Sequence, residues 1–224
     1  MMRKATPAER ATAERLDALS RAAFWSNETN IDPSDAVAGI RLAVALRQLG
    51  RFDEADASAA KVLAVHPDDY DALLETARAR ISARQGFYAI QPLKQAIKAR
   101  PRDWKPVSLM GVALEQSERP DEARVAYQQA LVLSPDNPAV LSNLAMSCAA
   151  KGDRVQAEAL LRKAVAQPDA TIQERQNLAL ILGLNGQMVE AERLIREDLP
   201  PEVASANLAY LRSLQTPPQT PAPR

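Results

Sequence analysis

Apolar and polar residues follow one another in this chain with the spacing of paired amphipathic helices, and the pattern returns every 34 residues. One small residue keeps its place throughout, as Ala55, Ala89, Ala123, Ala157 and Ala191. Twelve residues before each of these stands another small residue, in the series Ala43, Ala77, Gly111, Ala145 and Ala179. Small residues let two helices approach closely, and a fixed period of this length predicts one helix pair stacked on the next.

Prolines mark the end of the period in its first three copies, at Pro67, Pro101 and Pro135. Proline ends a second helix because it lacks the N–H group that another turn requires. Alanine and proline at these places resemble the tetratricopeptide signature. The resemblance implies an all-α solenoid of about five helix pairs in a right-handed superhelix, with first helices lining a concave face. We expect the repeats at 36–69, 70–103, 104–137, 138–171 and 172–203.

Two repeats depart from this pattern. Repeat 2 has Arg80 where a large apolar residue is expected, and Pro92 inside its second helix, which we expect to be distorted. Pro92 is either a mild bend near the helix start or a functional hinge. Repeat 5 has Arg175 at the tryptophan position and Asp198 at the last small position, and its second helix should end early, at the Pro200–Pro201 pair.

Both ends of the array need closing elements, since a terminal repeat otherwise leaves an apolar face in water. Residues 1–33 are expected to form an N-terminal arm and a capping helix, a degenerate half repeat. That helix should run from about Ala8 to Trp25, with an apolar side made of Leu16, Leu19, Ala23 and Trp25. A C-terminal capping helix is expected over 204–214, on the apolar residues Val203, Leu208, Leu211 and Leu214. Residues 215–224 are proline-rich and predict a disordered or polyproline tail.

Charge argues against two classes of partner. The 28 basic and 28 acidic residues cancel, so the chain offers no basic stripe for nucleic acid. The longest apolar run, LALILGL at 178–184, is too short for a membrane span. The first ten residues contain no apolar signal-peptide core, although a leader removed beforehand would leave the same picture.

Reactive and metal-ligating residues are too few for a catalytic site. The chain has one cysteine, Cys148, and one histidine, His66, so no Cys/His metal cluster forms. Cys148 falls at a packing position and His66 in an inter-repeat turn, which separates them. The acidic pairs Asp53–Glu54 and Asp68–Asp69 fit helix capping. We therefore expect no catalytic residue, no metal and no cofactor.

Binding remains, and the repeat pattern predicts the residues of a concave groove. Its candidate residues are Val37, Ile40, Val44, Leu74, Arg78, Lys105, Ser108, Val112, Asn143, Met146, Gln173, Asn177 and Leu180. Asn143 and Asn177 share one place in adjacent repeats, where a side-chain amide can pair with an extended peptide backbone. Tetratricopeptide proteins that hold peptides often carry asparagine there. The alternative is that both are solvated polar residues beside the helix seam.

The carboxylate clamp of co-chaperones in this superfamily is not assembled here. Ile40, Val44, Glu75 and Leu109 occupy positions that the clamp would need. An apolar or amphipathic segment of a protein partner fits the groove better, with apolar side chains providing affinity and amides fixing register.

The last part of the chain carries a second resemblance. RQNLALILGLNGQMVEAERLIREDLPPEVASANLAYLRSL, at 175–214, resembles the C-terminal end of TadD-type proteins of the bacterial tight-adherence (Flp) pilus machinery. The distinguishing features are the D-L-P-P break, Asp198 to Pro201, and the A-N-x-A-Y-L-R helix, Ala206 to Arg212. The resemblance implies a factor that helps to assemble the pilus secretin. It also implies a periplasmic or outer-membrane-associated location, whereas the chain would be cytoplasmic if it is full length as given.

The sequence thus predicts a non-enzymatic scaffold or assembly factor, binding partners through its groove in Flp pilus biogenesis. A pilus secretin or another pilus assembly component is the expected partner. A cytoplasmic co-chaperone or regulatory adaptor would use the same groove. A homo-oligomeric structural module would instead bury the groove, or the surfaces around Trp25 and Trp104, against another copy.

Overall fold

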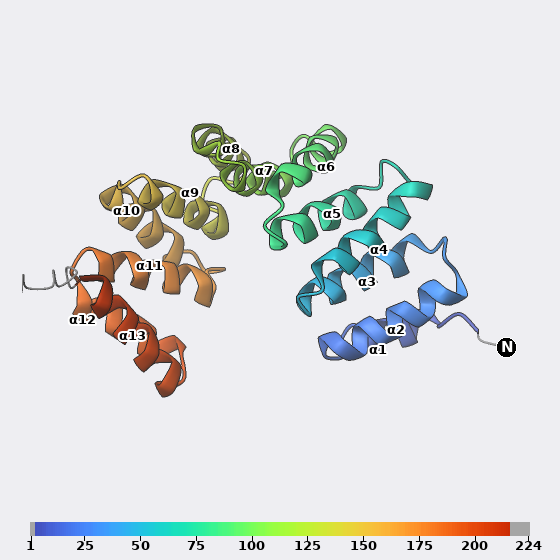
Figure 1. Ribbon diagram of the computed structural model, residues 1–224, viewed down its shortest axis with the longest axis horizontal. Coiled ribbons are helices and arrows are strands. Elements are labelled where there is room, and N and C mark those ends of the chain that lie inside the picture. The colour runs from blue at the N-terminus through green and yellow to red at the C-terminus, as the bar shows by residue number, and fades with distance from the viewer. Residues whose placement is uncertain (1–2, 216–224) are drawn as a thin grey trace, which may run out of the picture. The chain divides into compact units, whose positions relative to one another are not determined.

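The computed structural model describes residues 3–215, which form thirteen α-helices and no strand (Figure 1). In chain order they are α1 (Pro7–Ala13), α2 (Ala18–Ile31), α3 (Ala36–Gln48), α4 (Phe52–Val65), α5 (Tyr70–Ser82), α6 (Gly86–Ala99), α7 (Trp104–Gln116), α8 (Pro120–Leu133), α9 (Pro138–Ala150), α10 (Arg154–Val165), α11 (Ile172–Leu184), α12 (Met188–Asp198) and α13 (Pro201–Gln215). The predicted all-α repeat fold is confirmed. The tail predicted at 215–224 lies, apart from its first residue, outside the described residues.

The 34-residue period is visible in where the helices begin. The first helices α3, α5, α7, α9 and α11 start 34 residues apart, and so do the second helices α4, α6, α8, α10 and α12. A capping residue fixes each first start, because its side chain accepts a hydrogen bond from a backbone N–H of the first turn. These caps are Asp35, Asp69, Asp103, Asn137 and Thr171.

The chain divides into two compact units, Met1–Gln129 and Ala130–Arg224, with the boundary inside α8. In the first unit, α5 packs against α4 and α6, and it also contacts α3 and α7. In the second unit, α11 is packed in the same way, against α10, α12, α9 and α13. Each of these first helices is thus held by its own second helix and by the preceding pair.

The small residues of the period lie where two helices meet. Ala43 and Ala55 of the first repeat are 1% and 0% exposed, and their counterparts in the other repeats are also buried. Gly111 shows how close the approach is, since a Cβ atom there would overlap the ring of Tyr127. Close approach without voids is what stabilises each helix pair.

A second pair of positions in the period, the fourth and the twenty-seventh residues of the repeat, exchanges volume and charge from repeat to repeat. In repeats 2 and 4 this pair is a leucine and an alanine, all of them buried. Repeat 1 reverses the sizes: a Cβ on Gly39 would meet the side chain of Val62. In repeat 5 the pair is ionic, with Arg175 donating to both carboxylate oxygens of Asp198 at 2.7–3.0 Å. The two departures of repeat 5 are therefore partners of one another.

The departures of repeat 2 also compensate. α6 runs without interruption through Pro92, which leaves the carbonyl of Tyr88 without its usual helical donor. The guanidinium of Arg80 donates to that carbonyl oxygen at 2.8 Å, and its Nε contacts Asp56 at 3.0 Å. Arg80 thus replaces the hydrogen bond that Pro92 removes.

The N-terminal end differs from the single helix expected over Ala8–Trp25. The structure has two helices, because Asp17 caps a new one by accepting from the N–H groups of Leu19 and Ser20. The helix α2 begins and ends 34 residues before α4, so it takes the place of a second helix.

The predicted apolar side of this segment is also wrong. Leu16 and Leu19 are 42% and 64% exposed and Ala23 is exposed, while Trp25 is buried with Ala22 and Glu28. The cap at Asp17 sets the rotation of α2 and turns the last three of these residues inward.

A polar cluster closes this end. Arg10 donates to the buried carboxylates of Glu28 and Asp35, and Lys4 contacts Asp35 at 2.8 Å. Although burial opposes the change, hydrogen bonds from Arg10 and Lys4 lower the pKa of Asp35. Arg10 also stacks 5.5 Å from the centre of the Trp25 ring. The first unit therefore ends in paired charges over one buried aromatic ring.

The C-terminal end follows the prolines. The helix α12 ends at Asp198, before Pro200 and Pro201, as expected from that pair. The helix α13 buries Ala204, Leu208 and Leu211, with Leu211 lying against Gly183. Val203 and Leu214, expected to pack, are each 46% exposed, because they lie beside the buried strip and not on it.

Each repeat turns from its first to its second helix through a residue with positive φ. Three of these residues are glycines, Gly50, Gly152 and Gly186, and the others are Arg84 at φ 62° and Glu118 at φ 59°. Left-handed backbone is unfavourable for residues with a Cβ atom. Repeats 2 and 3 therefore contain local backbone strain at this turn.

Exchanging Arg175→Leu together with Asp198→Ala should recreate the leucine–alanine pair of repeats 2 and 4. We expect Arg175→Leu alone to lower the free energy of unfolding by about 1–3 kcal/mol, because it leaves a buried carboxylate unpaired. The double variant should recover to within about 1 kcal/mol of the original chain in urea denaturation. A double variant no more stable than Arg175→Leu would contradict this account.

The pH dependence gives an independent check on the same pair. The hydrogen bond from Arg175 lowers the pKa of Asp198, so this contribution is present above the ordinary aspartate pKa and lost as pH falls through the lower folded pKa. The stability difference between the original chain and Arg175→Leu should accordingly shrink on acidification.

Glu118→Gly should raise the free energy of unfolding by about 0.5–1 kcal/mol, because glycine adopts this φ without strain. The matched control is Gly152→Ala, where a Cβ meets nothing within 4 Å and only the backbone is strained. The control should lose about 1 kcal/mol in the same thermal or urea melts. Unchanged stability in both variants would contradict the strain.

Candidate functional site

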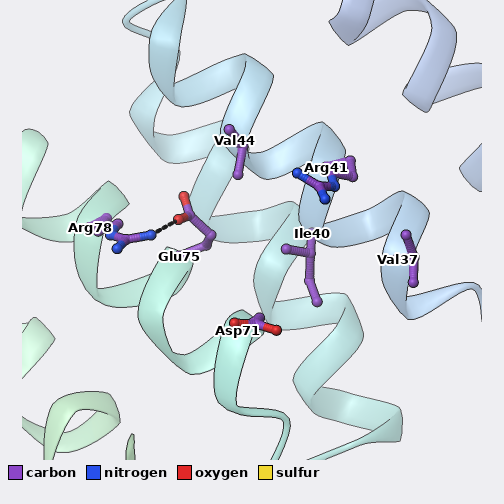
Figure 2. A pocket seen from close by; sticks show the side chains of 7 residues that line it. All are labelled: Val37, Ile40, Arg41, Val44, Asp71, Glu75 and Arg78. Carbon is purple, nitrogen blue, oxygen red and sulfur yellow. Dashed lines mark hydrogen bonds and ion pairs between the residues drawn. The ribbon is translucent and has the colours of Figure 1, made fainter. Parts of the chain in front are cut away.

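A hollow of about 300 Å3 lies between the first helices α3 and α5 of the first unit (Figure 2). Its lining residues are Val37, Ile40, Arg41, Val44, Asp71, Glu75 and Arg78. Four of them, Val37, Ile40, Val44 and Arg78, belong to the groove predicted from sequence. The helical spacing of the first three places them along one side of α3, where they form an apolar wall.

The opposite wall, on α5, is polar. Glu75 is 3% exposed and accepts hydrogen bonds from Arg78 and from Nε of Arg47, the latter at 3.0 Å. Two guanidinium groups thus share one buried carboxylate, which satisfies the charge and fixes both arginines. Asp71 is exposed at the other end of this wall, as Figure 2 shows. The hollow therefore offers apolar contact on one side and fixed charges on the other.

Other groove residues of the first unit differ in accessibility. Leu74 and Ser108 are buried, at 3% and 4% exposed, so their side chains offer little surface to a ligand. Lys105 is exposed. Val112 lines a separate hollow of about 350 Å3 with Arg84, Glu115 and Gln116. The predicted set thus includes both surface and core residues.

In the second unit, the predicted residues lie on α9 and α11. Asn177 donates from Nδ2 to the hydroxyl of Ser142 at 2.8 Å, and its Oδ1 accepts from Gln173 at 3.1 Å. Each of these amide groups can make a second bond, so Asn177 is oriented and still able to donate and accept. Asn143, Met146 and Leu180 are partly buried beside it on the same two helices. This arrangement can hold a peptide backbone against apolar side chains.

Sequence reasoning missed the residues that make the first hollow polar. Glu75 was considered only as a clamp position, and Arg41 and Asp71 were not expected to contribute. Their signal was available, because Arg41 and Glu75 share the repeat position of Asn143 and Asn177, and Asp71 shares that of Val37. The pairing of Glu75 with Arg47 comes from two different repeats and has no local signature.

The reactive residues have structural surroundings. Cys148 is 4% exposed, and its Sγ lies 3.3 Å from Oε1 of Gln156, as expected of a packing residue. His66 is exposed in the turn after α4. Within residues 3–215, no group of three or more histidine, cysteine or acidic side chains is placed to hold a metal ion. In that same range, no helix has the length and apolar character needed to cross a membrane.

The indole of Trp25, considered as a surface for self-association, is 2% exposed within its own chain. It packs against Phe24 with ring centres 5.0 Å apart and lies under Arg10. Trp25 therefore serves the core of the first unit.

Known proteins share this repeat pattern. Two tetratricopeptide repeat family models match the chain, one over residues 40–103 and the other over 114–181. The cellulose synthase operon protein C of Pseudomonas fluorescens is 30% identical over 152 residues, which is 62% of this chain and 12% of that protein. The chain spans 12% to 50% of the length of the curated relatives that it matches.

Solved structures show the same fold. A tetratricopeptide repeat protein from Parabacteroides merdae has a TM-score of 0.78 at 14% identity, covering 93% of this chain and 86% of that one. A thermophilic repeat protein of Thermus thermophilus has a TM-score of 0.69 at 24% identity, covering 79% and 98%. With the helix register and the family matches, these likenesses show that the chain belongs to the tetratricopeptide repeat family.

Proposed function

We propose that this chain is a non-enzymatic scaffold that holds segments of partner proteins against its first helices. The observation that carries the proposal is the hollow between α3 and α5, where an apolar wall faces arginines fixed by Glu75. Ligand sites commonly combine an apolar surface with a few oriented polar groups. The amides held on α9 and α11 provide the same combination in the second unit. The matching families are repeat families, none of them enzymatic.

The more specific proposal is a role in assembling a Flp pilus, with the pilus secretin as partner. It rests on the resemblance of residues 175–214 to TadD-type proteins, including the break at Asp198 to Pro201 and the helix that carries Ala206 to Arg212. The break and the closing helix are not features of a generic repeat. The relative from Pseudomonas fluorescens is named for a cellulose synthase operon, which favours a scaffold role without indicating the pilus.

Asn143→Ala combined with Asn177→Ala should weaken binding of segments held by the second unit. We expect a loss of about tenfold in affinity, because two amides that pair with the ligand backbone are removed. Peptides selected on the intact chain from a random display library provide the ligands, and fluorescence anisotropy measures their affinity. Helicity by circular dichroism should not change, and an unaltered affinity for every selected peptide would refute this site.

Val37→Ser combined with Val44→Ser should reduce co-purification of the pilus secretin from host cells by about tenfold, because the apolar wall is lost. The matched control is Val65→Ser, an equally exposed valine at the end of the second helix α4. The control should retain the secretin at the original level. Failure of the original chain to retain the secretin would contradict the pilus role and leave segment binding to the peptide experiment.

A further inference from the structure

The closing helix α13 packs onto the second unit in the manner of a first helix. It contacts both α11 and α12, and it does so through one buried strip with spacings of four and three residues. The same spacing occurs among the buried residues of α9 and α11. The three strips are Val140, Leu144 and Ser147 on α9; Glu174, Leu178 and Ile181 on α11; and Ala204, Leu208 and Leu211 on α13.

This register assigns equivalent surface positions to the three helices. Successive residues of an α-helix are separated by about 100°, so the residue before each buried one lies on the same flank of every strip. On α9 and α11 these flanking residues include the candidate site, Asn143 with Met146 and Asn177 with Leu180. On α13 the equivalent residues are Asn207 and Tyr210. Asn207 and Tyr210 therefore continue the two rows that the repeats begin.

We propose that α13 is the third row of a binding face of the second unit, with Asn207 and Tyr210 as ligand-binding residues. The inference rests on the proposed segment-binding function and deepens it. Tyr210 is 61% exposed and Val203, about two turns before it, is 46% exposed, so both offer apolar surface that the fold leaves uncovered. Asn207 is exposed and adds an amide able to donate and accept. The closing helix thus has a binding role as well as a capping role.

The absence of charge from this face selects the occupant. Its nine flanking residues are Ala139, Asn143, Met146, Gln173, Asn177, Leu180, Val203, Asn207 and Tyr210. None is ionisable near neutral pH, in a chain of which 25% is charged. At the corresponding positions of the first unit stand Arg41, Asp71, Glu75, Arg78 and Lys105. A charged ligand residue buried on the face of α9, α11 and α13 would lose water without gaining a partner, which is costly.

The occupant is therefore an uncharged, extended peptide segment. Packed helices lie about 8–10 Å apart, and an extended chain advances about 3.3 Å per residue. Adjacent asparagines thus match about every third residue of the ligand, and three rows span about six or seven residues. The amides pair with the ligand backbone, while its apolar side chains contact Met146, Leu180 and Tyr210.

The experiment uses nine-residue peptides selected from a random display library on the intact chain. We expect the selected peptides to lack charged residues in their central part. Replacing a central residue of a selected peptide by aspartate or lysine should weaken binding at least about tenfold. Peptides whose central part is charged would overturn the proposed occupant.

Variants of α13 test the binding residues. Tyr210→Ala should weaken peptide binding about tenfold and Asn207→Ala about threefold to tenfold, measured by fluorescence anisotropy. Ala209→Ser is the matched control, exposed on the other side of α13, and should change affinity less than about twofold. Both test residues are exposed, so thermal melts should coincide with that of the original chain.

The outcomes separate this inference from the function on which it rests. Peptides that lose affinity on Asn143→Ala with Asn177→Ala, but keep it on Asn207→Ala and Tyr210→Ala, would overturn the third row and leave segment binding standing. Peptides insensitive to all four substitutions would overturn both. Loss of affinity in both sets of variants, with the control unchanged, supports the extended face.

Discussion

The close approach of two helices at small residues is the constraint on which the rest of this structure depends. Ala43 meets the second helix near Ala55, and every repeat keeps a residue no larger than alanine at both places. A larger side chain there would force the pair apart, and the following pair would have no matching surface. The identity of two small side chains therefore sets the geometry on which every exposed face is built.

Around this fixed contact, other core positions vary in compensating pairs. Gly39 is matched by Val62, and Arg175 by Asp198, while Arg80 supplies a donor that Pro92 removes. Core packing conserves volume and hydrogen bonding more strictly than it conserves residue type. A repeat can thus lose its signature residues and keep its place in the array.

The fold was predictable because the period holds through five repeats without an insertion. The caps at Asp35 and Asp69 were equally visible in the sequence, since they recur with the same period, but they were not used. The break at Asp17 was not predictable from periodicity, because strong helix formers stand on both sides of it. The exposure of Leu19 followed from the same error, since a new cap changes the rotation of the helix.

The candidate site was predictable only as far as its positions. Val37 and Asn177 were found because each lies at a place fixed by the repeat. The burial of Leu74 and the sharing of Glu75 between two arginines depend on neighbours from adjacent repeats, and no single-helix pattern contains that information. Asn207 was hidden because a shortened α12 shifts the register before α13.

The hydrogen bond from Arg80 to the carbonyl of Tyr88 has a historical consequence. A chain that acquired proline at position 92 first would pass through a form with an unsatisfied carbonyl, whereas a chain that acquired the arginine first would not. The two changes are thus ordered in descent, and reversion of the arginine is closed while the proline stays. A single contact in this helix pair makes part of the ancestry of the repeat effectively irreversible.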